Sequence, residues 1–347
     1  MFVVIGEALV DLVGQRGSRT LVAHPGGSPA NVALGLARLG DPVTLMTRLG
    51  RDAFGEMISS HLQESGVRVD AGPDDGVKTS LAVASLAGGI ATYDFRIEWD
   101  LGTLAPLPVE TRCLHTGSLA TVLEPGKTDV EDLMELEHQR GRVTISYDPN
   151  VRPALLGTPD EARPEIEKLV AISDVVKVSD EDLQWLYPDR EDEEVARDWL
   201  GRGPVLVVVT RGGQGVYAVT ADLELHRPAT QVDLVDTVGA GDSFTSGLLD
   251  GLRRADLIGG QRRDALAAVD EATLVSVLDE ASLVAAITCS RPGANPPTRA
   301  ELDSAQAGGP TVTAPRAQAI PRAASSTPSP SGAGMTTGAP SPAPRST

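Results

Sequence analysis

The stretch "VDTVGAGDSF", Val235 to Phe244, raises the question on which the interpretation of this sequence depends. Three small residues, Gly239, Ala240 and Gly241, precede an apolar helical pattern, and Asp242 follows them directly. In one interpretation Asp242 is a helix cap, because a carboxylate near a helix N-terminus is stabilised by the positive end of the helix dipole. In the other, the small residues leave backbone N–H groups open for an anion, and Asp242 accepts a proton beside it.

The composition of the chain excludes several classes of protein. Its 347 residues suffice for one large α/β domain or two ordinary ones, and 41% of them are hydrophobic. The net charge of -18 argues against nucleic-acid and membrane partners, since both favour a basic face. The two cysteines, Cys113 and Cys289, indicate a reducing compartment. Because there is no signal-peptide pattern and no apolar run of about 18 residues, we expect a cytoplasmic protein.

Strand-like and helix-like segments alternate along most of the chain. Strand-like runs occur at residues 2–9, 43–50, 143–150, 175–179 and 205–213, and several of them are apolar throughout, as expected for parallel strands that are covered on both faces. Apolar spacings of three and four predict helices at residues 28–40, 52–66, 165–173, 180–188 and 193–201. The alternation predicts an α/β fold with a doubly wound, mostly parallel sheet flanked by helices.

Two regions depart from this alternation. Residues 77–100 contain two strand-like runs around the glycine pair at 88–89, which predict a hairpin. Together with residues 11–25 they predict a small separate β-sheet, which we interpret as a lid over the site rather than as an edge feature. Residues 306–347 are rich in Pro, Ala, Ser, Thr and Gly and contain no acidic residue, so we expect a disordered tail after a folded domain at 1–305.

The turn at residues 239–241 matches neither of two common nucleotide-binding motifs. The P-loop pattern is absent from the sequence, and the turn lacks the third small residue and the early position of a dinucleotide fingerprint. The strand-like residues 231–237 and the helical pattern after Gly241 place it at a helix N-terminus, which binds anions. A carboxylate there would repel a resting phosphate, but it has a task in phosphoryl transfer to a hydroxyl. On these residues alone the helix-cap interpretation stays open.

Further motifs occur before and after this turn. The stretches "GGSPANVALGLARLG" at 26–40 and "DTVGAGDSF" at 236–244 resemble the two signatures of the ribokinase-like (PfkB-type) carbohydrate kinases. Four shorter motifs follow the order of that family: "DPNVRP" at 148–153, "VKVSDED" at 176–182, "TRGGQGV" at 210–216 and "TCSRPGANPPT" at 288–298. The resemblance covers about residues 1–305, is greatest to fructokinases, and implies a ribokinase-like fold with ATP-dependent phosphorylation of a sugar hydroxyl.

The resemblance implies a role for each matching residue. Asp242 would take the proton from the sugar hydroxyl, and the N–H groups of Gly239, Ala240 and Gly241 would stabilise charge on the γ-phosphoryl group in flight. The residues expected to bind the sugar are Asp11, Gly26, Gly27, Asn31, Arg96 and Arg152. Those expected to bind ATP are Lys177, Ser179, Thr210, Gly212 and Gly215. For the two arginines the competing interpretations are an exposed lid residue and a structural residue at a strand end.

The expected metal ions involve one departure from the family pattern. The motif N-x-x-E reads Ser179-Asp180-Glu181-Asp182, so Asp182 is one methylene shorter than the expected Glu. We expect Asp182 to hold Mg²⁺ through water, with Glu181 as the alternative. The resemblance further implies a monovalent cation, K⁺, near Asp236 and Gly293, and a homodimer formed through the lid.

The sequence leaves several substrates open. Fructose, converted to fructose 6-phosphate, is the first expectation, and another sugar of the same kinase family is the alternative. For 2-keto-3-deoxygluconate, Arg96 and Arg152 would supply the cationic clamp that its carboxylate needs, but the negative charge of Asp94 opposes it. A sugar sensor without catalysis is a third hypothesis, which the departure at Asp182 favours and the complete turn before Asp242 opposes.

Overall fold

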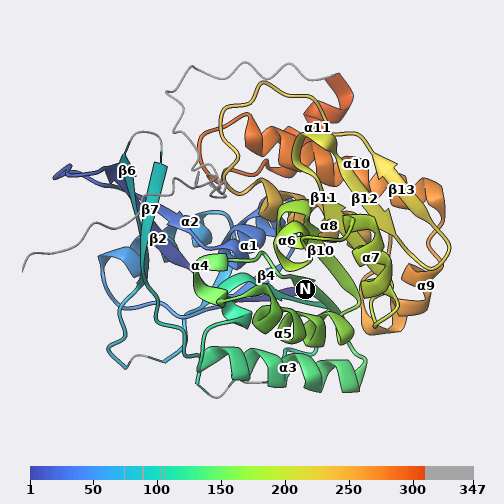
Figure 1. Cartoon of the computed structure of the whole chain (residues 1–347), viewed down its shortest axis with the longest axis horizontal. Coiled ribbons are helices and arrows are strands. Elements are labelled where there is room, and N and C mark those ends of the chain that lie inside the picture. The colour runs from blue at the N-terminus through green and yellow to red at the C-terminus, as the bar shows by residue number, and fades with distance from the viewer. Residues whose placement is uncertain (74, 88–89, 103, 105, 309–347) are drawn as a thin grey trace, which may run out of the picture.

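The computed structural model has a central β-sheet with helices on both faces and a smaller sheet at one end (Figure 1). It describes residues 1–308 except 74, 88–89, 103 and 105. Within these residues the main sheet has the strand order β13-β12-β11-β10-β9-β8-β1-β4-β5. Its strands are β1 (Phe2–Ile5), β4 (Val43–Met46), β5 (Arg68–Asp70), β8 (Cys113–Gly117), β9 (Thr144–Asp148), β10 (Val175–Ser179), β11 (Leu206–Thr210), β12 (Val216–Val219) and β13 (Glu224–Arg227).

All neighbouring strands from β11 to β5 pair in parallel, while β12 and β13 add an antiparallel edge. The chain builds this sheet outward from β1, first through β4 and β5 on one side and then from β8 to β11 on the other. The strand order therefore reverses beside β1, which confirms the predicted doubly wound architecture. In such sheets a crevice forms at the carboxyl ends of the strands where the order reverses.

The side chains of β1 alternate between two hydrophobic cores. Phe2 and Val4 belong to one core and Val3 and Ile5 to the other, as expected for a strand covered on both faces. The first core is covered by α1 (Ser28–Arg38), α2 (Ala53–Glu64), α8 (Ala240–Arg254), α9 (Arg263–Ala267) and α10 (Glu271–Cys289). The second is covered by α3 (Gly126–Arg140), α4 (Pro153–Leu156), α5 (Pro159–Ala171), α6 (Asp180–Leu186) and α7 (Asp192–Leu200).

The smaller sheet is the one that the sequence predicts as a lid. Its order is β3-β2-β6-β7, with β2 and β6 parallel and the two outer pairs antiparallel. Its strands are β2 (Leu9–Gln15), β3 (Val22–Gly26), β6 (Ser80–Ala87) and β7 (Ile90–Arg96). Its limits are thus shifted slightly from the predicted 11–25 and 77–100, and the expected turn at 88–89 lies outside the described residues. Figure 1 shows this sheet standing beside the main one.

The predicted strand at residues 231–237 is wrong, because this segment is a loop. The N–H groups of Val235 and Asp236 both donate to the carbonyl of Cys289, at 2.9 and 3.1 Å, rather than to a neighbouring strand. The sheet already ends at β13, and the loop crosses instead towards the end of α10. At the C-terminal end, α11 (Arg299–Gly308) continues past residue 305, and the rest of the expected tail lies outside the described residues. Short 3₁₀ turns lie at Ser118–Thr121, Gly212–Gln214 and Gly260–Arg262.

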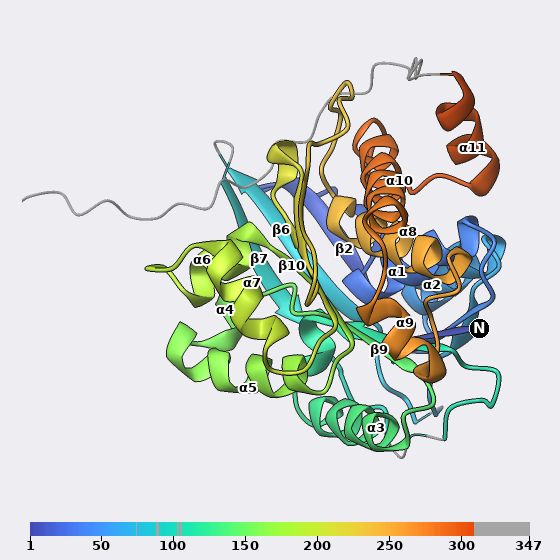
Figure 2. The same cartoon turned by 90° about the vertical axis from the view of Figure 1, so that its right-hand side faces the viewer.

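Helix α10 is a core helix. Among the described residues it alone is long and apolar enough to cross a membrane by length and composition, with a mean hydropathy of 1.6. However, it packs along α8, as the view in Figure 2 also shows. Gly247 of α8 permits this close approach, since a Cβ atom there would lie 2.8 Å from the Cα of Ala281 and 3.1 Å from a methyl group of Val284.

This contact gives a test of the packing. Gly247→Ala should lower the free energy of unfolding by about 1 kcal/mol, because overpacking costs about 1–3 kcal/mol and alanine regains up to about 1 kcal/mol of helix propensity. The matched control is Gly201→Ala, whose Cβ would lie 3.4 Å from its nearest neighbour, an ordinary contact. Urea unfolding of both variants measures the difference. Equal stability of the two variants would contradict the close helix–helix contact.

Candidate active site

The first turn of α8 lies beside β10, since a Cβ atom on Gly241 would be 3.1 Å from the Lys177 nitrogen. Gly239, the N-cap residue, adopts a left-handed conformation with φ 73°, and no side chain caps the helix. Within the described part of the chain, the N–H groups of Gly239 and Gly241 have no hydrogen-bond acceptor, whereas that of Ala240 donates to the carbonyl of Thr237 at 3.2 Å. Two of the three predicted anion-binding donors are thus free, and the third is engaged in a turn.

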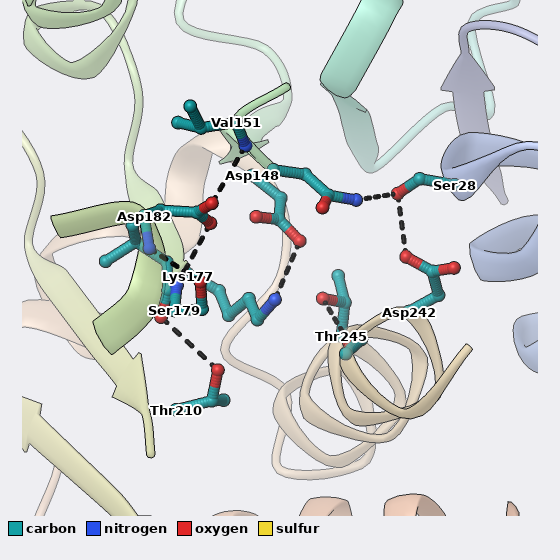
Figure 3. A network of polar contacts seen from close by, with 12 residues as sticks. Ser28, Asp148, Val151, Lys177, Ser179, Asp182, Thr210, Asp242 and Thr245 are labelled. Atoms are coloured by element: carbon teal, nitrogen blue, oxygen red, sulfur yellow. Dashed lines mark hydrogen bonds and ion pairs between the residues drawn. The ribbon is translucent and has the colours of Figure 1, made fainter. Parts of the chain in front are cut away.

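Asp242 does not cap its own helix. Its carboxylate accepts hydrogen bonds from two side chains of α1. The hydroxyl of Ser28 donates at 2.7 Å, as Figure 3 shows, and the amide of Asn31 donates at 2.8 Å. Burial raises the pKa of Asp242, and these two hydrogen bonds oppose the rise because they stabilise the charged form. The structure therefore favours the second interpretation of the turn, in which a fixed and buried carboxylate lies beside free N–H groups.

Ser28 connects this carboxylate to the segment after β9. The amide nitrogen of Asn150 donates to the Ser28 hydroxyl at 2.7 Å, and the Arg152 guanidinium donates to the Asn150 side-chain oxygen at 2.6 Å. Arg152 is thus half-buried near the site, and its guanidinium also donates to the backbone carbonyls of Asn150 and Val151. These contacts match the structural interpretation of this arginine, and its binding of a sugar stays a prediction. Asn31 also lies in the site, with its amide on Asp242.

A buried ion pair lies on the other side of the turn. The ammonium of Lys177, in the middle of β10, contacts the carboxylate of Asp148, the last residue of β9, at 2.9 Å. A Cβ atom on Gly241 would lie 3.1 Å from the Lys177 nitrogen, so this cation faces the first turn of α8. Burial alone would lower the pKa of Lys177, but the charges of Asp148, Asp182 and Asp242 raise it above its ordinary value. Lys177 is therefore a permanent cation at the site of expected phosphate binding.

Asp11 on β2 and Gly26 on β3 are diagonal neighbours on the lid strands, because Asp11 pairs with His24 and Gly26 with Leu9. A Cβ atom at Gly26 would collide with the Asp11 carboxylate, so any larger residue here would displace that side chain. At Gly27 a Cβ atom would collide with the carbonyl of Glu7. Burial raises the pKa of Asp11 to about 6, against the lowering influence of His24 and Arg152. A half-buried carboxylate in this position is suited to accept hydrogen bonds from hydroxyl groups.

Arg96, in contrast, is not brought to this cluster. It lies at the end of β7 with an exposed side chain, and within the described residues it makes no hydrogen bond or ion pair. No contact of Arg96 among the described residues supports its predicted binding of the sugar, which stays a prediction.

The residues expected to bind ATP lie at the ends of β10 and β11. Ser179 and Thr210 face each other in register at the carboxyl ends of these strands. Gly212 lies in the 3₁₀ turn that follows β11, and Gly215 ends it. These four residues thus share one edge of the sheet with Lys177, beside the first turn of α8.

Asp182 is part of the first turn of α6. Its N–H donates to the Ser179 hydroxyl at 3.1 Å, and its carboxylate accepts from the N–H groups of Ser179 at 3.4 Å and Val151 at 3.1 Å. Burial and the nearby Asp148 raise the pKa of Asp182 to about 6. Asp182 therefore closes a capping box, while the neighbouring Glu181 has an exposed side chain.

The site has the oxygen chemistry that a hard divalent cation requires. One carboxylate oxygen of Asp148 is buried and has no hydrogen-bond partner, although the other contacts Lys177. The negative charge of Asp148 raises the pKa of Asp182, so these two carboxylates lie near each other. In the described residues no three His, Cys, Asp or Glu side chains form a ready metal site. The donors fit a cation held partly by water and by phosphate.

Asp236 and Gly293 lie together, as predicted. The carboxylate of Asp236 accepts from the N–H of Gly293 at 2.8 Å and from that of Val238 at 3.0 Å. This contact ties the loop before α8 to the loop after α10, at the base of the anion-binding turn.

Sequence reasoning missed three residues of the site as functional candidates: Ser28, Asp148 and Asn150. Each lies inside a motif that was recognised, "GGSPANVA" or "DPNVRP". For Asp148 and Asn150 the available signal was a pair of polar residues at the carboxyl end of the buried strand β9, since side chains at that end of a parallel strand lie near the site in such sheets. For Ser28, the first residue of α1, the motif itself was the only signal. Glu7 was also missed; it is buried, and burial raises its pKa to about 7.

Comparison with known proteins agrees with this geometry. The family model "pfkB family carbohydrate kinase" matches residues 1–301. This chain belongs to the pfkB carbohydrate kinase family. A fructokinase of Rhizobium leguminosarum bv. trifolii is 34% identical over 267 residues, which are 74% of this chain and 81% of that protein.

Solved structures of family members superpose on most of the chain. The fructokinase of Xylella fastidiosa with bound ATP matches with a TM-score of 0.77 and 27% identity, covering 88% of this chain and 98% of that one. A fructokinase double mutant from Vibrio cholerae O395, with fructose, ADP and potassium ion, matches with a TM-score of 0.73 and 28% identity, covering 87% and 97%. The ribokinase-like fold is therefore confirmed, and the protein is an ATP-dependent sugar kinase.

The buried lysine of this pfkB kinase gives a second test. Lys177→Met should lower the free energy of unfolding at pH 7 by about 3–5 kcal/mol, because it leaves buried carboxylates without their cation. The loss should shrink as the pH falls and the carboxylates become protonated. Urea unfolding measures both effects, with Lys168→Met as the control, since Lys168 is half-exposed on the surface. A stability loss no larger than that of the control would contradict the role of Lys177 as a counter-charge.

Proposed function

We propose that this kinase phosphorylates fructose, transferring the γ-phosphoryl group of ATP to the primary hydroxyl and producing fructose 6-phosphate. The observation that supports the chemistry is the Asp242 carboxylate, fixed by Ser28 and Asn31 beside free N–H groups of the α8 turn. The choice of fructose is supported by the fructokinases among its relatives. The expected location is the cytoplasm.

In this proposal Asp242 is the general base. Its burial raises the pKa and so increases its basicity, which favours removal of the hydroxyl proton as the oxygen attacks phosphorus. The proton moves to the carboxylate, the bond from phosphorus to the ADP oxygen breaks, and the phosphoryl group joins the sugar oxygen. The two hydrogen bonds from α1 hold the carboxylate in one orientation during this step.

The charge on the transferring group is stabilised by donors from two elements. The N–H groups of Gly239 and Gly241 point from the α8 turn, and the Lys177 ammonium approaches Gly241 from β10. Donors that are already in place need no reorganisation during the reaction, which is why such groups contribute strongly to catalysis. Ala240 joins them only when its N–H leaves the carbonyl of Thr237.

Asp148 and Asp182 would hold Mg²⁺ together with the phosphates of ATP. Bound there, the cation would neutralise phosphate charge. The unpartnered oxygen of Asp148 is the protein atom best suited to this role. Asp236 and Gly293 form the base of the proposed K⁺ site, since they join the two loops beneath the turn.

The sugar would bind between the lid and α1. Asp11 and Asn31 would take its hydroxyl groups, with Gly26 and Gly27 permitting close approach. Arg152 would contact the sugar from the segment after β9, whereas Arg96 would have to turn inward from its exposed position on β7. Leu21 and Val22 are exposed at the β3 end of the lid and fit the proposed lid-mediated dimer.

A kinase assay against a panel of sugars tests the proposal. ADP release is measured with Mg²⁺ and K⁺ for fructose, ribose, 2-keto-3-deoxygluconate, tagatose and adenosine, with Asp242→Asn as the blank. Fructose should be preferred, and Asp242→Asn should lower kcat by about 10²–10⁴-fold or more while sugar and ATP still bind. Preference for another substrate would overturn fructose only, and near-wild-type turnover of the variant would overturn the assigned base.

The pKa of Asp11 gives a prediction of pH dependence. A carboxylate with a pKa of about 6 is charged above that pH and accepts hydroxyl hydrogen bonds, and it loses this ability as the pH falls. The KM for the sugar should therefore rise below about pH 6, approaching ten-fold per pH unit, while Asp11→Asn shows a high and nearly constant KM.

His24 faces Asp11 across the lid strands, and the charges of His24 and Arg152 both lower the pKa of Asp11. His24→Gln is the control that removes the imidazole. A KM that rises equally in wild type and Asp11→Asn would assign the pH dependence to another group.

A further inference from the structure

Polar side chains form a continuous chain of hydrogen bonds from Arg152 to Asp242. Arg152 donates to the Asn150 side-chain oxygen at 2.6 Å, and the Asn150 amide donates to the Ser28 oxygen at 2.7 Å. Ser28 then donates to Asp242 at 2.7 Å, as Figure 3 shows. The four residues come from the segment after β9, the start of α1 and the start of α8, so the chain joins three separate parts of the fold.

The direction of each hydrogen bond follows from the chemistry of its members. A guanidinium can only donate, so the oxygen of Asn150 faces Arg152 and its NH₂ group faces Ser28. The Ser28 oxygen therefore accepts, and its single hydroxyl hydrogen is left for the Asp242 carboxylate. With Asn150 turned the other way, the same hydroxyl would donate to Asn150 and leave Asp242 without this hydrogen bond.

The backbone at Asn150 is an independent sign that this placement matters. Its φ of 39° lies in the left-handed region, which non-glycine residues rarely adopt and which asparagine tolerates better than most. Its carbonyl oxygen also accepts from Arg152, at 2.9 Å. Unusual backbone conformations of this kind persist where the surrounding structure enforces them, and they concentrate at functional sites.

We propose that Ser28 is a positioning residue for the Asp242 carboxylate, and that Asn150 and Arg152 fix the direction of its hydrogen bond. This inference rests on the proposed role of Asp242 as the base. Ser28 holds one carboxylate oxygen and Asn31 the other. These two donors from α1 thus set both the orientation and the proton affinity of the carboxylate. Asn150, which accepts from Arg152, sets in turn the direction of the Ser28 hydrogen bond.

Other charged groups also act on Asp242. Asp148 from β9 raises its pKa and Lys177 from β10 lowers it, and the buried Glu7 beyond β1 interacts with it as well. These groups are unchanged when the Ser28 hydroxyl is deleted. A shift seen in Ser28→Ala therefore reports the hydrogen bond itself.

The first test deletes the hydroxyl. In Ser28→Ala the pKa of Asp242 should rise, since the charged carboxylate loses a donor. The shift is followed by carbon-13 NMR of the aspartate carboxyl groups across pH, with Asp242→Asn identifying the signal. In the kinase assay kcat should fall about ten-fold with little change in the KM for ATP, and the acidic limb of the pH profile should move upward.

Ser173→Ala is the matched control. Ser173 is equally buried, its hydroxyl donates to the carbonyl of Leu169, and it lies at the far end of β10 from the site. This variant should leave the titration of Asp242 unchanged. An unshifted Asp242 titration in folded Ser28→Ala would overturn the proposal. The NMR readout needs no turnover, so it decides the role of Ser28 even where the sugar panel refutes the proposed function.

The second test reverses the hydrogen bond without altering α1. Asn150→Asp keeps the size of the side chain but cannot donate, so the Ser28 hydroxyl should turn towards residue 150 and away from Asp242. Asn150→Asp should raise the pKa of Asp242 in the otherwise wild-type protein. The same substitution should raise it less in a protein that already carries Ser28→Ala. Such non-additivity is the sign of a shared hydrogen bond. Equal shifts in both backgrounds would show a purely electrostatic effect and would overturn the proposed chain.

Discussion

The active site depends on one buried cation. Lys177 is the ammonium group that contacts Asp148 directly and that the carboxylates of Asp182 and Asp242 also face. Without a counter-charge, carboxylates at this degree of burial would take up protons, because desolvation disfavours their charged form. The raised pKa values of Asp182 and Asp242 show that the compensation is partial. The site therefore holds several buried carboxylates with raised pKa values, and the charge of Lys177 stabilises their charged forms.

The scaffold brings these charges together by two geometrical features. Parallel strands deliver Asp148, Lys177 and Thr210 to the same edge of the sheet, since each lies at or near the carboxyl end of its strand. The first turn of α8 then approaches this edge with its positive end and its free N–H groups. The close packing of α8 on α10 and α1 fixes the direction of that helix. Rigid elements rather than loops thus hold the groups that would face the phosphate in the proposed function.

The sequence predicts much of this arrangement, but not all of it. Apolar strands, helical periodicity and the order of the motifs suffice for the fold and the small separate sheet, and they identify Asp242 as a candidate. The partners of Asp242 were not predictable in the same way, since Ser28 lies 214 residues away and the contact exists only after folding. A side chain inside a motif also looks the same whether it points into the site or away. For this reason the sequence identified only Arg152 in this motif as a candidate, and not Asn150 or Asp148.

The wrong strand at 231–237 has a similar cause. Alternating apolar residues such as Val232 and Leu234 have the pattern of a half-buried strand, yet a strand also needs a free sheet edge to pair with. Here the preceding hairpin of β12 and β13 ends the main sheet, and Leu234 is left exposed. Local pattern cannot report whether a pairing partner exists elsewhere in the fold. Tertiary structure decides such segments.

The small sheet has a consequence for the order of events in catalysis. Asp11 lies on β2 and Gly26 on β3, so in the proposed mode of sugar binding part of the pocket would belong to the lid itself. A lid that only covers a finished pocket changes access alone. Here, movement of the lid would also assemble or dismantle the pocket, so capture of the sugar and exclusion of water are one event. Release of the product must then break the same contacts, which couples departure of the phosphorylated sugar to the opening of the lid.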